Sequence, residues 1–189
     1  MISVAIVFHS GYGHTKVIAE GVARGVESAG DSHVHLIHVD AIDTHWETLQ
    51  AADAIIFGSP TYMGSASAQF KGFMDASSKQ WGKWRDKIAA GFTNSASQSG
   101  DKLATLTQLA VFAAQHQMIW TSLGLMPGNN SSTGTVDDLN RLGSFLGVMS
   151  QSNADQGADL SPSSADQRTA EYLGTRVAEV TKRWKRGQA

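Results

Sequence analysis

The sequence contains no cysteine among its 189 residues, and neither sign of charge dominates. The absence of cysteine excludes disulfide bonds, thiolate nucleophiles, iron–sulfur clusters and cysteine-ligated zinc. Fifteen Lys and Arg against 17 Asp and Glu exclude a generally basic nucleic-acid binder. No apolar run approaches the length that spans a bilayer, and the first residues lack the basic flank of a signal peptide. We therefore expect a cytoplasmic protein without a nucleic-acid partner or a membrane-inserted segment.

Short apolar runs alternate with segments of helical spacing along the chain. The predicted strands cover residues 4–8, 34–39, 54–57, 88–92 and 118–123. The predicted helices carry apolar stripes within residues 18–29, 66–77, 103–113 and 170–184, and Asp101 is a predicted N-cap of the third. Strands and helices that alternate in this way predict an α/β protein in which helices cover both faces of a parallel sheet. The length favours a single domain over residues 1–189.

The loop after the first predicted strand has the composition of a phosphate-binding turn. Residues 9–15 read HSGYGHT and lead directly into a helix. The two glycines allow a sharp turn that presents backbone N–H groups, and the helix N-terminus favours an anion. The loop lacks the Lys of a Walker A motif and the third glycine of the dinucleotide fingerprint. Because it contains no Lys or Arg, it suits a phosphate monoester held by neutral donors.

Two further strand ends carry polar or aromatic loops. Residues 58–65 read GSPTYMGS and present an aromatic side chain and a thioether, which suit a flat ring. Residues 93–100 read TNSASQSG and are small, polar and uncharged. In an open parallel sheet, ligands bind beyond the carboxyl ends of the strands, where these loops meet. The three loops together predict a site for a phosphorylated heterocycle.

These loops resemble those of the WrbA family, which are flavodoxin-like NAD(P)H:quinone oxidoreductases. The resemblance rests on residues 10–15 and 58–70, and it extends to Trp81, to residues 115–118 and to the last helix at 172–178. It implies a flavodoxin-like fold, with five parallel strands in the order 2-1-3-4-5, and bound FMN as cofactor. It also implies a two-electron hydride transfer from NAD(P)H through FMN to a quinone. At residues 62–63 this chain has Tyr-Met where the family usually has Arg-Phe.

The resemblance assigns roles to particular residues. The FMN contacts that it implies are Ser10, Tyr12, Gly13, His14, Thr15, Pro60, Thr61, Tyr62, Met63, Gly64, Asn94, Ser95, Ala96, Ser97, Gly100 and His116. Tyr12 and Trp81 are implied contacts of the nicotinamide or quinone. No side chain is expected to act as a nucleophile, and no metal is expected.

Other functions share the phosphate-loop features. A flavodoxin-type one-electron carrier is one alternative, although the carriers of that family are typically strongly acidic. A reductase that releases FMN is a second, and a binding module without flavin is a third. His116 has an alternative structural interpretation, as an imidazole near a helix C-terminus.

An oligomer is predicted from the distribution of charge. Residues 88–165 hold few charged residues, and Trp81, Trp120 and Met126 lie in or beside that part of the chain. Interface cores are depleted in charge and enriched in aromatic residues and Met. We expect a homodimer or homotetramer in which the nicotinamide pocket is completed across a subunit boundary.

Overall fold

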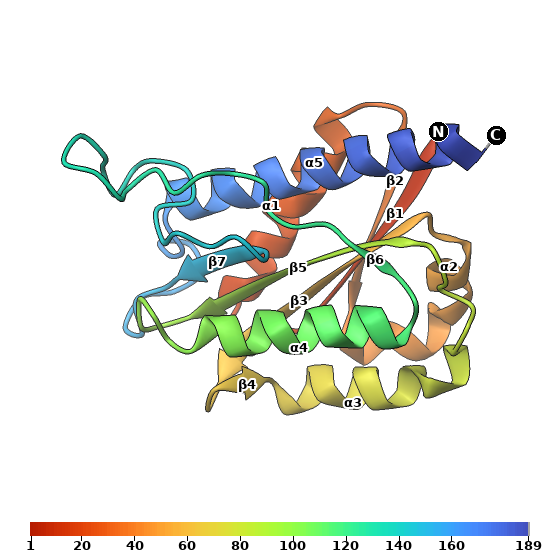
Figure 1. The fold of residues 1–189 in the computed structure, drawn as a ribbon. Helices are drawn as coiled ribbons and strands as arrows, with labels where there is room; N and C mark the ends of the chain where they lie inside the picture. The colour runs from red at the N-terminus through yellow and green to blue at the C-terminus, as the bar shows by residue number, and fades with distance from the viewer. Residues whose placement is uncertain (189) are drawn as a thin grey trace.

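A parallel β-sheet forms the centre of the computed structural model, which describes residues 1–188. Its main strands are β1 (Ile2–Phe8), β2 (Ser32–His38), β3 (Ala54–Tyr62), β5 (Ile88–Ser95) and β6 (Ile119–Trp120). They lie in the order β2-β1-β3-β5-β6, and every neighbouring pair is parallel (Figure 1). Over the five positions of this sheet, the order is the predicted 2-1-3-4-5, and the flavodoxin-like fold is confirmed.

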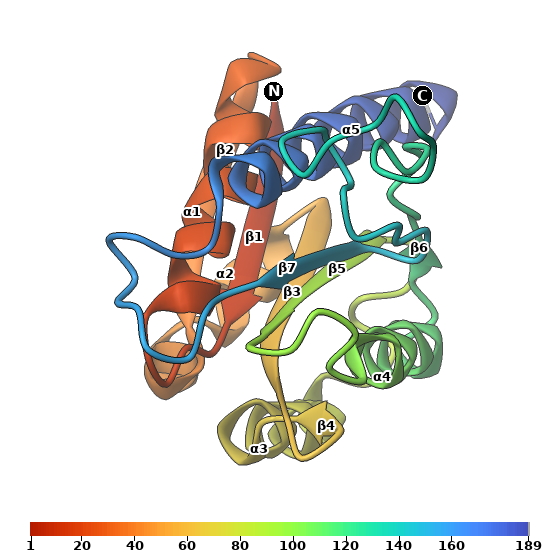
Figure 2. The ribbon, with the colours of Figure 1, turned by 90° about the vertical axis from the view of Figure 1, so that its left-hand side faces the viewer.

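Helices cover both faces of the sheet, as Figures 1 and 2 show. One face packs against α1 (His14–Ser28) and α5 (Ser164–Gln188). The other packs against α2 (Trp46–Ala51), α3 (Ala68–Ala76) and α4 (Lys102–Gln115), and two 3₁₀ helices span Val39–Thr44 and Ser77–Gln80. Within residues 1–188, no helix is long and apolar enough to cross a lipid bilayer.

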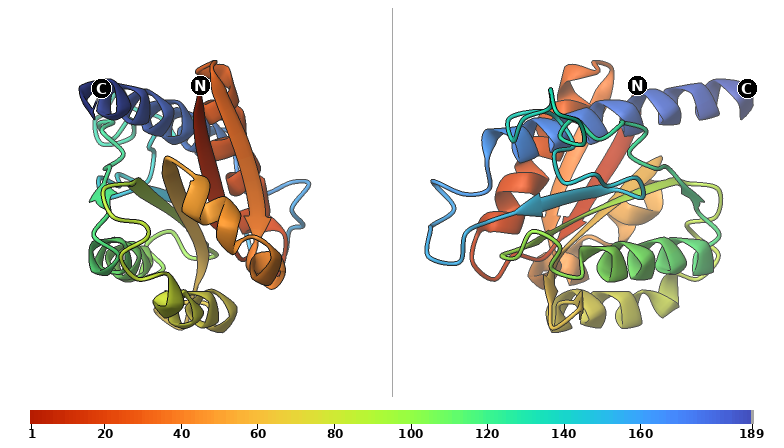
Figure 3. Two further views of the ribbon diagram at one scale, coloured as in Figure 1. Left: turned by 90° about the vertical axis from the view of Figure 1, so that its right-hand side faces the viewer. Right: turned by 60° about the vertical axis from the view of Figure 1, so that its left-hand side comes forward.

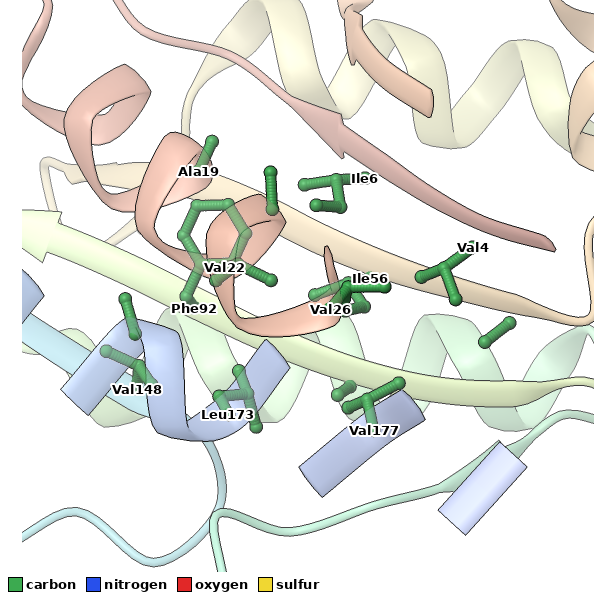
Figure 4. Close-up of a cluster of buried hydrophobic side chains, with 14 of the residues drawn as sticks. Val4, Ile6, Ala19, Val22, Val26, Ile56, Phe92, Val148, Leu173 and Val177 are labelled. Atoms are coloured by element: carbon green, nitrogen blue, oxygen red, sulfur yellow. The ribbon is translucent and has the colours of Figure 1, made fainter. Parts of the chain in front are cut away.

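β1 and the first halves of β3 and β5 are apolar because side chains on both of their faces are buried, whereas β2 at the edge is partly exposed and carries three His. In β1, Val4 and Ile6 point to the α1 and α5 layer, whereas Ala5 and Val7 point to the opposite one. Figure 4 shows the first of these clusters, where Val4 and Ile6 lie near residues of both helices. The continuous apolar runs of the sequence follow from this double burial.

The fifth position of the sheet is shared by two short strands, which differs from the single strand predicted at 118–123. Only Ile119–Trp120 pairs with the start of β5. The chain then leaves the sheet and returns as β7 (Val148–Gln151), which pairs with the end of β5 (Figure 3, right). Gly147 allows this return, because a Cβ there would overlap the backbone of Gly91. The return of the chain places the segment after β7 at the carboxyl edge of the sheet.

The close packing of α1 against α5 holds that segment in place. A Cβ at Gly25 would overlap the Glu171 carbonyl, and a Cβ at Gly174 would overlap the backbone of Val22. The two helices therefore approach through their backbones, and Arg24 Nε donates to Glu171 Oε1 at 2.8 Å. The residues between β7 and α5 then pass beside the start of α1 (Figure 2).

Candidate functional site

A cleft of about 730 Å³ lies at the carboxyl edge of the sheet, beyond β1, β3 and β5. Its lining residues are Ser10, Tyr12, His14, Thr15, Pro60, Thr61, Tyr62, Met63, Asn94, Ser95, Ala96, Ser152, Ala154, Gln156 and Gly157. None of them is Asp, Glu, Lys or Arg. The cleft thus has the size of a cofactor site and combines an aromatic wall with neutral polar groups.

One end of the cleft is the loop that leads into α1. Gly13 is the N-cap residue of this helix and has a φ of 90°, in the left-handed region that favours glycine. Ser10 Oγ accepts a hydrogen bond from the Lys16 N–H at 3.2 Å, which closes the turn. Thr15 is 1% exposed and lines the cleft, and its hydroxyl has no hydrogen-bond partner within residues 1–188. An anion at this end would meet backbone N–H groups, a free hydroxyl and the positive end of the helix dipole.

His14 connects this loop to the segment that follows β7. Its Nε2 lies 2.9 Å from the Gln156 carbonyl, so this nitrogen is the donor and carries the proton. A Cβ at Gly13 would lie 2.9 Å from the Ala158 side chain, which shows how closely the two segments approach. Ser152, Ala154, Gln156 and Gly157 form the wall that the sequence analysis missed. The only sequence signal was the unusual length of the polar region before the last helix, since long loops in compact domains are often functional.

Tyr62 and Met63, at the rim of the cleft, belong to a tight hairpin. Thr61 pairs with Ala66 and Tyr62 with Ser65, where β4 (Ser65–Ala66) runs antiparallel to the end of β3. The two residues between them, Met63 and Gly64, have φ values of 49° and 77°, as a two-residue type I′ turn requires. Such a conformation is strained for Met, and its side chain is fully exposed at the rim of the cleft.

Tyr62 and Tyr12 form the aromatic part of this rim. Their rings pack edge to face with centroids 6.2 Å apart. Burial raises the pKa of Tyr62, and the nearby Tyr12 adds to this effect. A Cβ at Gly11 would lie 2.8 Å from the Tyr62 hydroxyl, so glycine is needed there for the tyrosine to lie against the loop. The Tyr62 phenol is therefore neutral at physiological pH, and both rings offer flat surfaces to a ligand.

The deeper polar residues are held by their neighbours. The Thr61 hydroxyl lies 2.8 Å from the hydroxyls of both Thr93 and Thr105, so it is already paired within the core. Asn94 Oδ1 accepts from Ser150 Oγ at 2.7 Å and from Ser152 Oγ at 3.0 Å. This arrangement orients the Asn94 amide with its oxygen toward β7 and leaves its NH₂ group for the cleft.

The remaining predicted contacts fall into two groups, one in the loops around the cleft and one beyond the end of α4. Gly13, Gly64, Ser97 and Gly100 belong to the loops that carry lining residues without lining the cleft themselves. Asp101 stands at the predicted N-cap position of α4 but makes no side-chain cap bond, because its own φ of 55° is left-handed.

His116 and Trp81 lie at the opposite end of the sheet in the same chain. They line a separate pocket of about 200 Å³ beyond the end of α4, a helix about 20 Å long that starts near the cleft. The Trp81 Nε1–H donates to the Gln115 carbonyl at 3.0 Å, and His116 Nε2 lies 2.8 Å from Ser77 Oγ. Burial lowers the pKa of His116 and favours its neutral form. Within one chain, neither residue reaches the cleft.

The fold and the cleft together define a flavodoxin-like FMN protein. The family model described as NADPH-dependent FMN reductase matches residues 31–126. The chain is 41% identical over 186 residues to flavodoxin FldP of Pseudomonas aeruginosa, covering 95% of this chain and 97% of that protein. It is 30% identical over 207 residues to an NAD(P)H dehydrogenase (quinone) of Trichlorobacter lovleyi, covering 97% and 98% of the two chains.

A solved structure gives the same result. The crystal structure of a protein described as a flavodoxin, WrbA-like protein from Agrobacterium tumefaciens superposes with a TM-score of 0.76 at 42% identity, covering 97% of this chain and 99% of that one. The chain belongs to the family of NADPH-dependent FMN reductases, and its resemblance to the WrbA-like quinone oxidoreductases is confirmed.

The residues present fit FMN. The loop before α1 offers neutral donors to the terminal phosphate, with the unpaired Thr15 hydroxyl facing the cleft. The rim formed by Tyr12, Tyr62 and Met63 offers flat and polarisable surface to the ring system. The Asn94 amide and the following loop offer hydrogen bonds to ring carbonyls and nitrogens.

Proposed function

We propose that this protein is an FMN-dependent NAD(P)H:quinone oxidoreductase, a single domain acting in the cytoplasm, where NAD(P)H is available. The observation that carries the proposal is the uncharged cleft, which combines anion donors at the start of α1 with an aromatic rim. Family membership and the identity to proteins named NAD(P)H dehydrogenase (quinone) support it. FMN, when bound, would accept a hydride from the nicotinamide and pass two electrons to a quinone.

The protein's own residues would hold and orient the reactants. The N–H groups at the start of α1 and the Thr15 hydroxyl would bind the phosphate. Tyr62 and Met63 would lie beside the ring, and the loop after β5 would donate hydrogen bonds to its polar edge. The exposed Tyr12 side chain is placed to contact a second flat molecule, either the nicotinamide or the quinone. No side chain needs to form a covalent bond with a substrate.

A flavodoxin-type electron carrier is the second candidate, and the 41% identity to a protein named flavodoxin favours it. The chain has a net charge of −2, whereas a carrier that docks on basic partners needs a strongly acidic surface. The deciding experiment is steady-state oxidation of NADH and NADPH by the FMN-loaded protein with benzoquinone. Turnover supports the oxidoreductase, and a flavin that is reduced only by a protein partner supports the carrier. The stoichiometry of co-purifying FMN separates both from a reductase that releases flavin.

We also propose that the active species is a homodimer or homotetramer. Trp81 and His116 would then contribute to the substrate pocket of a neighbouring copy, because they do not reach the cleft of their own chain. Trp81 is 67% exposed, and Leu103, Met126 and Phe145 are also exposed apolar residues of the charge-poor region or beside it. Exposed apolar surface of this kind is typical of interfaces.

Light scattering at micromolar concentration tests the oligomer, and the mass of a single chain would refute it. In a Trp81→Ala variant, turnover with NADH should fall while the FMN content stays the same. Unaltered kinetics would place the substrate pocket elsewhere.

A further inference from the structure

Lys102, the first residue of α4, is fully buried beneath the loop that borders the cleft. Its Nζ donates to Ser95 Oγ at 2.8 Å and to the carbonyls of Ser97 and Gln98 at 2.6 and 2.8 Å. Within residues 1–188, no carboxylate lies within ion-pairing distance of it. A buried ammonium at the positive end of a helix dipole is unfavourable on both counts. The hydrogen bonds from Lys102 Nζ to the loop offset this cost, because they satisfy backbone carbonyls that an apolar residue would leave unpaired.

A buried ion pair extends this cationic site. Arg141 makes two parallel bonds to Asp166, from Nε to Oδ1 and from Nη2 to Oδ2, each 2.8 Å long. Asp166 Oδ2 also accepts from the Gln151 N–H, and Gln151 Nε2 donates to the Ala96 carbonyl at 2.9 Å. The three charges of Lys102, Arg141 and Asp166 sum to +1. Lys102 bonds the loop of residues 95–100 directly, and the ion pair acts on the same loop through Gln151.

The five backbone carbonyls of residues 95–99 all accept hydrogen bonds, from Lys102 or from residues 151–152 at the end of β7. Ser152 N–H donates to the first, Gln151 to the second and Lys102 to the other three. Because the N–H and C=O groups of a planar trans peptide point in opposite directions, the N–H groups of residues 98–100 point away from Lys102, and those of residues 96 and 97 point away from Ser152 and Gln151. Within residues 1–188, the N–H groups of residues 96–99 have no acceptor. The start of the loop, Ser95 and Ala96, lines the cleft, whereas Gln98 and Ser99 line a separate pocket together with Lys102 and Arg141.

We infer that Lys102 is a positioning residue for the cofactor: with Arg141 and Asp166 it holds the 95–100 loop so that the N–H groups next to Ser95 and Ala96 face the ring of FMN, and it places a net positive charge behind them. This inference rests on the proposed function, in which the cleft holds FMN. A free row of N–H groups backed by a positive charge favours the form of the ring with the greater negative charge. Reduction by a hydride adds negative charge, so the arrangement favours the two-electron reduced state.

The charge on Lys102 also gives this effect a pH dependence. Burial lowers its pKa to about 8, while Asp166 raises it and Arg141 lowers it further. These are the charged groups that face it from α5 and from the segment before β7; β5 and β7 present none. The ammonium is therefore present at pH 7 and lost by about pH 9.5.

The test compares Lys102→Met with Lys87→Met, a matched control. Lys87 is a partly buried lysine whose Nζ likewise donates to backbone carbonyls, those of Gln50 and Ala52. Burial lowers its pKa too, but it lies at the amino edge of the sheet. For each protein, the affinity for oxidised FMN is measured by fluorescence quenching. The two-electron midpoint potential of the bound FMN is measured against reference dyes at pH 7 and pH 9.5.

We expect Lys102→Met to bind oxidised FMN but to lower the ratio of reduced to oxidised affinity at least about tenfold at pH 7. At an effective dielectric constant near 20, a unit charge within about 12 Å contributes about 1.4 kcal/mol or more, which is a factor of ten. For a two-electron couple, a tenfold change corresponds to about 30 mV. The difference in midpoint potential between Lys102→Met and the parent should vanish at pH 9.5, where Lys102 is neutral. Lys87→Met should have the potential of the parent at both pH values. A Lys102→Met variant with the parent potential at pH 7 would overturn the inference.

A second measurement keeps the inference testable if Lys102→Met does not fold. Its potential, plotted against pH, should show a break near pH 8 that Lys87→Met retains and that Lys102→Gln loses. A plot without that break in the parent contradicts the inference. Failure of the parent to bind FMN at all would instead refute the proposed function, so the two failures are distinguishable.

Discussion

Thr15 provides the sharpest test of the phosphate site. Its side chain is 1% exposed and lines the cleft at the start of α1, where the hydroxyl has no partner within residues 1–188. Replacement by Val keeps the branched shape and removes the donor. A hydrogen bond to a charged group contributes about 1.5–3 kcal/mol. Since about 1.4 kcal/mol corresponds to a factor of ten, the dissociation constant of FMN should rise roughly 10- to 150-fold.

The assay is titration of the apoprotein with FMN, followed by quenching of flavin fluorescence. Thr15→Ser is the matched control, because it keeps the hydroxyl and should stay within about threefold of the parent. Thermal unfolding of each apoprotein checks that the fold is unchanged. If Thr15→Val binds FMN as tightly as the parent, the phosphate does not lie in this loop and the assignment of the cleft is wrong.

Three further predictions follow from the structure. Replacing both Tyr62 and Met63 by Gly should weaken FMN binding and shift its midpoint potential, because these side chains border the ring; if affinity and potential stay the same, the hairpin does not contact the ring. Gly58→Ala should lower the free energy of unfolding by about 1–3 kcal/mol, because its Cβ would overlap the Phe92 ring, and an unchanged urea midpoint would contradict this packing. The pKa of His116 is lowered by burial, so the unfolded chain binds more protons below about pH 6.5 and the folded state loses stability as the pH falls through that value. The drop in melting temperature between pH 7.5 and 5.5 should therefore be smaller in His116→Gln, and an equal drop in both proteins would assign the dependence to other groups.

The local pattern of apolar and polar residues was sufficient to predict most of the fold. The apolar runs at 4–8, 54–57 and 88–92 are strands because both faces of the sheet are covered, and such burial is visible in sequence as an uninterrupted apolar stretch. The glycine-rich turn before α1 was equally visible, because two glycines and hydroxyl residues before a helix have a direct conformational meaning. Eleven of the predicted contact residues line one cleft, since the carboxyl ends of parallel strands meet at one edge.

Long-range packing decided the rest, and no local pattern encodes it. The split of the fifth strand depends on how the chain returns to the sheet at Gly147, far from the point where it leaves. The wall at residues 152–157 reaches the cleft only because α1 and α5 approach through Gly25 and Gly174.

Burial likewise separates residues that look alike in sequence. By sequence, Lys102 is an ordinary lysine in the first turn of a helix. The tertiary structure encloses it beneath the loop of residues 95–100 and thereby makes its charge part of the site. His116 reads as a ligand contact, yet the length of α4 carries it to the opposite edge of the sheet. Sequence periodicity reports which face of an element is buried, whereas distance between remote segments and the exposure of a single charge depend on contacts that exist only after the chain has folded.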